Sequence, residues 1–417
     1  METEPEYIVY YKTLSKDFRT YNSSTTEFET MKRLPTTISN FYILKKYENN
    51  DEDLKRFSKD IKIASEQIKT KIPFDYIKPF VTKEGKTLIR THFKNIETFF
   101  NYNCKNEKTG EYLYKDFEHI TYQEYVWMNK TYNGGLQYTK TGTYQSYGYD
   151  FSNYYGDILG VKTKMAFKHE FKIPTKPGKE MKLKKIPESI KFGYYNVVVK
   201  SENETFNKIF AYSEDDVYTS NDLEFIKICK KTMNISVELN MDCEKNAYIY
   251  NLDSLISPHL IFQKWFDKII ELKKAFPKNM LLKCLSSTLW GTLSRSNTKR
   301  VSEEEADKMS IGITEKAEYY LKDEIHCSDG SIFYKVVPTK RPFFHPFRLK
   351  SFITSYGRTK IAYIALRDIE NVIKIQTDSI AYDKEIKHEI SSLIVDPKTT
   401  GYIKFVNNRD FKKVDKY

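Results

Sequence analysis

Cysteine is scarce in this sequence, and the positions of its few cysteines exclude two kinds of site. The chain of 417 residues has five cysteines, which are widely scattered and include no C-x-x-C pair. Such a set supports neither a disulfide framework nor a zinc site. We therefore expect a protein of a reducing, intracellular compartment.

Long apolar runs and a targeting segment are also missing. No run approaches the length of a membrane span. The first residues, 1–6, are acidic and are not typical of a signal or transit peptide. No membrane partner is expected.

Positive charge and aromatic rings are what the sequence has in excess. Lysine and arginine number 68 against 56 acidic residues, a net charge of +12. This balance favours a polyanionic partner, although a high lysine content alone produces it too. The 33 tyrosines and 27 phenylalanines could supply stacking surfaces for bases. Most single rings are nevertheless expected to be ordinary core or surface residues.

The stretch 148–159 predicts a strand that ends at a carboxylate and then turns into a helix. Tyr149 and Phe151 alternate with small or polar residues, as in a half-buried strand. Asp150 lies where the strand would end, close to Asn153, a good helix N-cap. A carboxylate there can present a metal ligand to a cleft, although most strand-end aspartates are caps or turn formers.

Two later stretches strengthen the metal-ligand interpretation. Residues 283–291 read KCLSSTLWG, and residues 375–380 read IQTDSI. In this order, the three stretches resemble motifs A, B and C of the family B DNA polymerases, written D-x-x-S-L-Y-P, K-x-x-x-N-S-x-Y-G and D-T-D-S. The resemblance covers residues from about 130 to 417 and includes no exonuclease.

The resemblance implies an α+β fold of the right-hand polymerase type. We expect a palm with an antiparallel sheet, two-helix fingers, a truncated thumb and a mixed N-terminal region. The expected parts are an N-terminal region of unknown role (1–125), palm with the first metal motif (126–257), fingers (258–295), palm with the second metal motif (296–400) and the start of the thumb (401–417).

Apolar spacing supports the two helices of the fingers. The pattern is helical from about 258 to 274 and is broken by Pro277. A second helix is expected to start near Met280 and to carry residues 283–291. Farther along, helical spacing runs to Ile364, and residues 372–382 predict a hairpin.

The three motifs imply nucleotidyl transfer with two Mg²⁺ ions. One ion would lower the pKa of the primer 3′-hydroxyl, and the other would hold the triphosphate and stabilise the leaving pyrophosphate. Asp150 and Asp378 would supply the carboxylates from adjacent strands, and the resemblance adds Phe151 to the metal site. Gln376 replaces the first aspartate of the third motif. This change should weaken the field near the primer end and leave the metal site in place.

The incoming nucleotide would be held by a lysine and a tyrosine. On a helix, Lys283 shares a face with Ser287, and its charge can neutralise a triphosphate. A solvated lysine on an amphipathic helix is the alternative. By resemblance, Tyr155 lies under the sugar and excludes a 2′-hydroxyl. The further nucleotide contacts expected are Lys278 and the backbone at Asn153 and Tyr154.

DNA contacts are also implied by the resemblance. Tyr132, Gly134 and Gly135 match the Y-x-G-G motif that precedes motif A in protein-primed and some other family B polymerases, where it contacts the single-stranded template. A hairpin turn is the alternative. The other expected DNA contacts are Trp290, Gly291, Thr377, Arg358, Lys404 and Lys413. For Arg358 and Arg348, ion pairs with palm carboxylates are the alternative.

The function implied by the resemblance is template-directed DNA synthesis of the viral or mobile-element type, without proofreading. The expected partners are template-primer DNA, deoxynucleoside triphosphates, and a protein that primes synthesis or supplies the missing exonuclease or thumb. A viral enzyme would act in the host cytoplasm or nucleus. Two alternatives stay open: an inactive polymerase remnant, and a basic replication-accessory protein that only binds nucleic acid.

Overall fold

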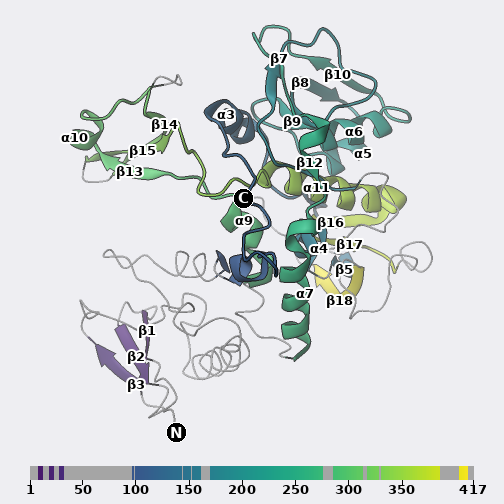
Figure 1. Ribbon diagram of the computed structural model, residues 1–417. Helices are drawn as coiled ribbons and strands as arrows, with labels where there is room; N and C mark the ends of the chain where they lie inside the picture. The colour runs from purple at the N-terminus through teal and green to yellow at the C-terminus, as the bar shows by residue number, and fades with distance from the viewer. Residues whose placement is uncertain are drawn as a thin grey trace. The chain divides into compact units, whose positions relative to one another are not determined.

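The computed structural model combines helices with antiparallel sheets, so the predicted α+β class is confirmed (Figure 1). It divides into two compact units, residues 1–114 with 261–292, and residues 115–260 with 293–417. The residues described are 8–12, 18–22, 28–31, 96–97, 99–142, 144–151, 153–160, 170–275, 285–312, 317–327, 330–385 and 403–411. Residues 51–71, where apolar side chains recur at spacings of three and four and predict a helix, lie outside them.

The second unit contains a five-stranded antiparallel sheet, here named the central sheet. Its strand order is β18-β5-β17-β16-β4. The strands are β4 (Gln137–Thr139), β5 (Tyr144–Phe151), β16 (Val372–Gln376), β17 (Ser379–Tyr382) and β18 (Ile403–Phe411). The predicted strand at Asp150 and the predicted hairpin at 372–382 are both confirmed. Residues 403–411, within the part expected to begin a thumb, form the edge strand β18.

A second sheet lies in the same unit and has the order β10-β8-β11-β7, with β9 also paired to β8. Its strands are β7 (Lys179–Met181), β8 (Gly193–Ser201), β9 (Val217–Thr219), β10 (Ile235–Leu239) and β11 (Ala247–Ile249). Helix α6 (Ser220–Cys229) follows β9 directly. A capping box starts it, in which Thr219 and Asp222 each accept a backbone N–H of the other.

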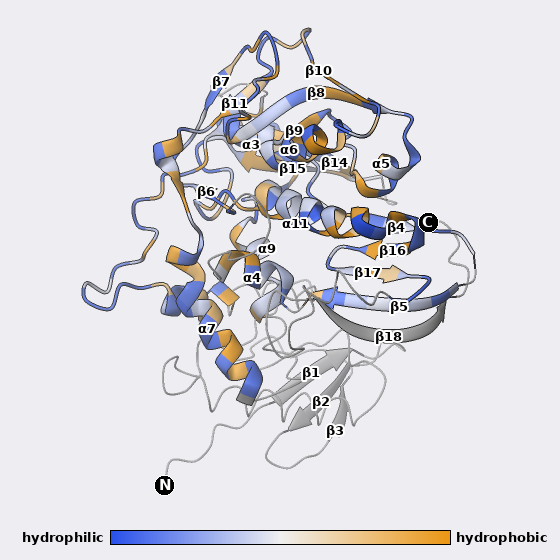
Figure 2. Cartoon of the chain, turned by 90° about the vertical axis from the view of Figure 1, so that its right-hand side faces the viewer, coloured by the Kyte–Doolittle hydropathy of each residue, from blue (hydrophilic) through white to orange (hydrophobic). Residues whose placement is uncertain are grey.

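Helix α11 (Lys350–Ala365) runs between these two sheets, as Figure 2 shows. It contacts α6, β9 and β17, and it also contacts α4 (Tyr154–Gly160). Almost all of its residues are buried, including Arg358 and Lys360. The helix therefore joins the second sheet to the strands that carry the predicted metal ligands.

Smaller elements complete the two units. Those of the second unit are α3 (Tyr122–Lys130), β6 (Ile173–Pro174), α5 (Glu204–Ile209), β12 (Leu255–Ile256), β13 (Lys299–Ser302), α10 (Glu303–Ala306), β14 (Tyr319–His326) and β15 (Ile332–Pro338), with 3-10 turns η2 (Leu252–Ser254) and η3 (Leu366–Asn371). The first unit has the sheet β1 (Ile8–Lys12), β2 (Phe18–Asn22) and β3 (Phe28–Met31), most of α7 (His259–Ala275) and most of α9 (Leu289–Leu293). None of the helices in the described part of the chain is long and apolar enough to cross a membrane.

A buried ion pair links Arg348, two residues before α11, to Glu124 of α3. The Arg348 guanidinium lies 2.6 Å from the Glu124 carboxylate, and neither side chain is exposed. Arg348 therefore forms an ion pair, although its partner Glu124 precedes the residues 126–257 that are expected to begin the palm. The Tyr250 hydroxyl also donates to Glu124 over 2.5 Å. Burial is the main influence on the pKa of Glu124 and raises it, while Arg348 opposes that rise.

Removing one member of this ion pair should lower the stability of the fold. We expect Arg348→Met to lower the free energy of unfolding by about 3–5 kcal/mol, because the Glu124 charge would stay buried without compensation. Urea unfolding followed by circular dichroism measures the effect. The double variant Glu124→Leu/Arg348→Met is the control and should recover most of the loss. A single variant as stable as the parent would contradict this account.

Candidate active site

The two predicted metal ligands occupy neighbouring positions at one end of the central sheet, Asp150 on β5 and Asp378 in the turn that leads into β17. In the antiparallel β5–β17 pairing, Asp150 is opposite Ser379, the residue that follows Asp378. The Phe151 N–H donates to the Asp378 carbonyl over 2.9 Å. Asp150 and Asp378 are both half-buried. The strands expected to be adjacent, β5 and β17, are paired antiparallel, and Asp378 lies in the turn one residue before β17 rather than on the strand itself.

Asp378 occupies a two-residue turn with a strained backbone. Gln376 and Ser379 pair at the ends of β16 and β17, which leaves Thr377 and Asp378 as the turn. Thr377 has a φ of 56°, a conformation that costs a β-branched residue about 1–3 kcal/mol. Its N–H donates to the Leu136 carbonyl over 2.9 Å. Contacts with the surrounding chain therefore hold the turn against its local preference.

The side chains of Asp150 and Asp378 offer carboxylate oxygens as ligands for a metal ion. Among the described residues, no group of three or more His, Cys, Asp or Glu side chains could hold a metal ion. Gln376 is exposed and pairs with Gln137 of β4. Two carboxylates suit Mg²⁺, because this ion keeps several waters and takes its remaining oxygens from substrate phosphates. Asp150 and Asp378 therefore fit the ion that the motifs imply.

The Y-x-G-G stretch packs directly against the Asp378 turn. A Cβ at Gly135 would lie 2.6 Å from the Thr377 Oγ1, and one at Gly134 would lie 2.5 Å from the Tyr132 hydroxyl. Neither position has room for a side chain without movement. The stretch is therefore a support for the turn, a role that its sequence does not predict.

Arg358 of α11 fixes the same stretch. Its guanidinium donates to the carbonyls of Tyr132 and Gly134 over 3.0 and 2.8 Å. It also pairs with both carboxylate oxygens of Asp222, at 3.0 and 3.1 Å. The side chain is only 4% exposed. Arg358 therefore makes the ion pair that was the alternative to a DNA contact, and its charge is buried against Asp222.

The two tyrosines that open α4 have different surroundings. Tyr154 is buried, and its hydroxyl donates to the Gly357 carbonyl over 2.6 Å. Its side chain therefore belongs to the core, and only its backbone remains for the predicted nucleotide contact. Tyr155 is half-buried. Burial, and to a lesser extent the charge of Asp378, raises its pKa to about 12, against a lowering by Arg358.

The turn between β5 and α4 also limits the predicted phosphate contacts. Asn153 has a φ of 52°, a conformation that asparagine tolerates better than most residues. Its carbonyl accepts the Asp157 N–H over 2.8 Å. The Phe151 N–H is already bonded to Asp378. The amide of Phe151 is thus unavailable for a phosphate contact beside those expected at Asn153 and Tyr154.

Lys360 is a buried lysine at the site, and the sequence motifs did not include it. It is 6% exposed, and its ammonium lies 4.8 Å from the Phe151 ring centroid and 5.3 Å from that of Tyr154. Burial lowers its pKa, and the charge of Asp157 opposes this. The apolar run that follows it, residues 361–365, is a weak signal that could have marked it. Lys360 supports the β5–α4 turn from α11.

Part of the predicted nucleotide-binding helix lies in the first unit. Residues 285–287 are helical, Thr288 is a bend, and α9 follows. The single helix expected through residues 283–291 is therefore interrupted, because hydroxyl side chains such as those at 286–288 compete for backbone hydrogen bonds. Ser287 is exposed, and Trp290 and Gly291 are half-exposed. Ser286 accepts a hydrogen bond from Lys273 of α7 over 2.7 Å.

The remaining predicted contacts are only partly visible. Lys278, Lys283 and Lys413 lie outside the described residues. Lys404 lies on β18, where its backbone is opposite Asp150 in the register of the sheet. Their roles in binding nucleotide or DNA stay predictions.

Comparison with known proteins adds a distant similarity. No protein-family model and no curated protein matches the chain. Among solved structures, it is similar to Phi29 DNA polymerase complexed with single-stranded DNA, with a TM-score of 0.48 and 16% identity over 75% of this chain and 51% of that one. For the ternary complex of that polymerase with primer-template DNA and incoming nucleotide substrates, the values are 0.48, 15%, 75% and 52%. The chain thus spans about half the length of the structures it matches, and this level of similarity establishes no family.

Proposed function

We propose that this protein is a template-directed DNA polymerase that adds deoxynucleotides to a primer 3′ end. The observation that supports the proposal is the position of Asp150 beside Asp378, on a strand end and an adjacent hairpin turn. Two Mg²⁺ ions held there would activate the attacking hydroxyl and stabilise the leaving pyrophosphate. The enzyme would be of family B type, without proofreading activity, and would act with a partner that primes synthesis.

The surrounding residues would orient the reactants. Thr377 and Gly135 would keep the Asp378 carboxylate at a fixed place. Tyr155 would meet the sugar of the incoming nucleotide. Lys283 would neutralise part of the triphosphate charge as a point charge.

Primer extension tests the proposal directly. The purified full chain is given a labelled DNA primer on a longer template, with deoxynucleoside triphosphates and MgCl₂. We expect template-dependent extension that stops when EDTA is added. Salt-sensitive DNA binding without any extension would instead support the inactive remnant or the accessory protein.

Tyr155 gives a prediction about sugar selection. We expect Tyr155→Val to raise the incorporation of ribonucleotides relative to deoxyribonucleotides by about 10- to 200-fold, since a steric exclusion of one small group is worth about 1–3 kcal/mol. Competitive single-nucleotide incorporation measures the ratio. Tyr138→Val, on strand β4, is the control and should leave the ratio unchanged. An unchanged ratio in Tyr155→Val would remove this tyrosine from the sugar site.

Gly135 gives a prediction about the support of Asp378. We expect Gly135→Ala to lower kcat for extension about 10²-fold, because a displacement of about 1 Å at a reacting group has an effect of that size. The new Cβ would meet the Thr377 side chain at 2.6 Å. Steady-state extension on a primed template measures kcat.

A second substitution tests whether this contact is the cause. Thr377→Gly removes the side chain that the new methyl would meet, and glycine accepts the positive φ at this position. The double variant Gly135→Ala/Thr377→Gly should therefore recover much of the activity that Gly135→Ala loses. If the double variant instead loses as much activity as the losses of the two single variants added together, the contact between Gly135 and Thr377 does not position Asp378.

A further inference from the structure

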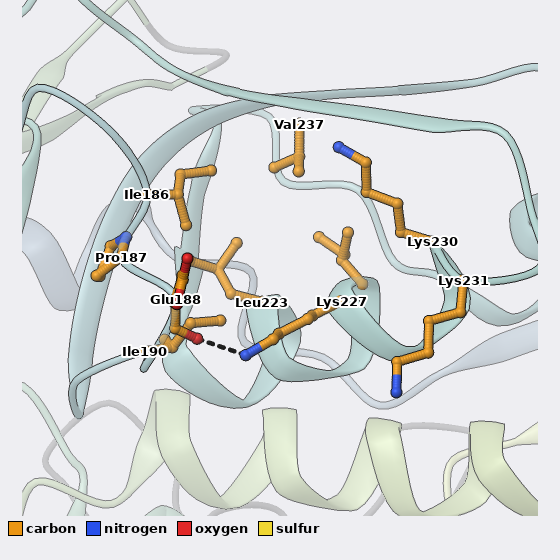
Figure 3. A pocket seen from close by; sticks show the side chains of 10 residues that line it. Ile186, Pro187, Glu188, Ile190, Leu223, Lys227, Lys230, Lys231 and Val237 are labelled. Carbon is orange, nitrogen blue, oxygen red and sulfur yellow. Dashed lines mark hydrogen bonds between the residues drawn. The ribbon is translucent and has the colours of Figure 1, made fainter.

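A hollow in the second unit lies away from the central sheet. It has a volume of about 320 Å³ and lies over α6 and strand β10 (Figure 3). The third wall is the irregular segment 186–190 between β7 and β8. The volume is at the low end of the range for ligand sites, about 300–1,000 Å³. It can take one large side chain or a short segment of chain.

The floor of the hollow is apolar. Leu223 and Ile226 of α6 are fully buried beneath it. Ile186, Ile190 and Val237 line it and are half-exposed. These three side chains would lose their remaining contact with water if an apolar group filled the space, and that loss would favour binding.

The rim of the hollow is basic. Three exposed lysines, Lys227, Lys230 and Lys231, project from the end of α6, against a single acidic lining residue, Glu188. Lys227 donates to the backbone carbonyl of Glu188 and so links two walls. The charge of this rim complements a ligand that carries several carboxylates or phosphates.

The lining favours a peptide over a nucleic acid. Proteins that bind single strands offer aromatic side chains on which bases stack. None of the ten lining residues is aromatic, in a chain that has 33 tyrosines and 27 phenylalanines. An apolar floor with a basic rim instead fits an acidic peptide with one apolar anchor.

We propose that this hollow docks an acidic segment of a partner protein. One large apolar side chain of that segment would enter between Ile186, Ile190 and Val237, while its carboxylates face Lys230 and Lys231. The site is independent of the carboxylate pair of the central sheet. Its occupancy can therefore be tested whether or not the chain synthesises DNA.

Fluorescence anisotropy with a defined probe tests the docking site. The probe is a fluorescein-labelled peptide of sequence EDEFEDE, titrated with the full chain at low salt, and EDESEDE is its matched partner without the anchor. We expect the phenylalanine peptide to bind at least about tenfold more tightly than the serine peptide, which corresponds to about 1.4 kcal/mol. Equal binding of the two peptides would overturn the proposal without any substitution in the protein.

Paired variants locate the binding. Lys230→Glu/Lys231→Glu should weaken binding of EDEFEDE at least about tenfold. Lys200→Glu/Lys245→Glu makes the same charge change at two other exposed lysines and should leave it within about twofold. An equal loss in both variants would show a nonspecific charge effect and overturn the proposal. A short single-stranded oligonucleotide is a further competitor. If it displaces the peptide, and if Lys230→Glu/Lys231→Glu weakens its binding, the hollow binds nucleic acid and the proposal is overturned.

Discussion

Asp378→Asn is expected to abolish primer extension while the protein stays folded. Asparagine keeps the shape of the side chain but lacks the charge that would hold the proposed metal ions, and metal-ion catalysis contributes several kcal/mol of transition-state stabilisation. At about 1.4 kcal/mol for each factor of ten, we expect kcat to fall at least about 10³-fold. Single-turnover extension of a labelled primer measures this rate, and a thermal melt checks the fold.

A nearby aspartate provides the matched control. Asp383 follows the same strand, β17, and makes a surface ion pair with Lys140 at 4.0 Å. Such pairs contribute about 0–1 kcal/mol, so Asp383→Asn should extend primers like the parent chain. If Asp378→Asn extended primers equally well, the polymerase proposal would be wrong. If both variants lost activity together, a general loss of folded protein would be the cause.

Arg358→Met is expected to lower both stability and activity. Removal of the guanidinium leaves the Asp222 carboxylate buried without its partner, which should cost about 3–5 kcal/mol. It also removes the donors to the carbonyls of Tyr132 and Gly134, so the stretch that supports the Asp378 turn loses an anchor. Urea unfolding measures the first effect, and primer extension measures the second.

A double variant separates these two effects. In Arg358→Met/Asp222→Asn the buried charge is gone, and asparagine can still accept the Thr219 backbone N–H at the start of α6, so we expect part of the stability to return. Activity should stay low, because Tyr132 and Gly134 still lack their donors. Recovery of activity together with stability would mean that Arg358 acts on the fold alone and does not position the site.

Local patterns in the sequence predicted much of the fold around the site. Alternation around Tyr149 predicted β5, the apolar spacing from 258 to 274 predicted α7, and the turn residues Thr377 and Asp378 predicted the hairpin. These signals are local, since each depends on neighbouring residues within one element. The spatial proximity of Asp150 and Asp378 came from the order of the motifs, because no local pattern pairs strands so far apart.

The supports of the site could not be predicted in this way. Arg358 and Asp222 are 136 positions apart, and Arg348 and Glu124 are 224 apart. The sequence around each of these residues does not indicate which distant residue it pairs with. Helix α11 also carries lysine, arginine, serine and threonine on several sides, which is typical of an exposed helix. Its burial follows from the two sheets that enclose it, and that arrangement is a property of the whole unit.

The strand order of the central sheet has a consequence for how the chain is made. Strand β5 pairs with β17 on one side and β18 on the other, and Asp150 and Asp378 are 228 positions apart (378 − 150). During translation, β5 therefore leaves the ribosome long before either neighbour exists. Non-local pairing of this kind is slow, and an open strand edge is prone to wrong association. Synthesis of this protein thus includes an interval in which β5 has two unprotected edges, and a chaperone that shields them should raise the yield of folded chain.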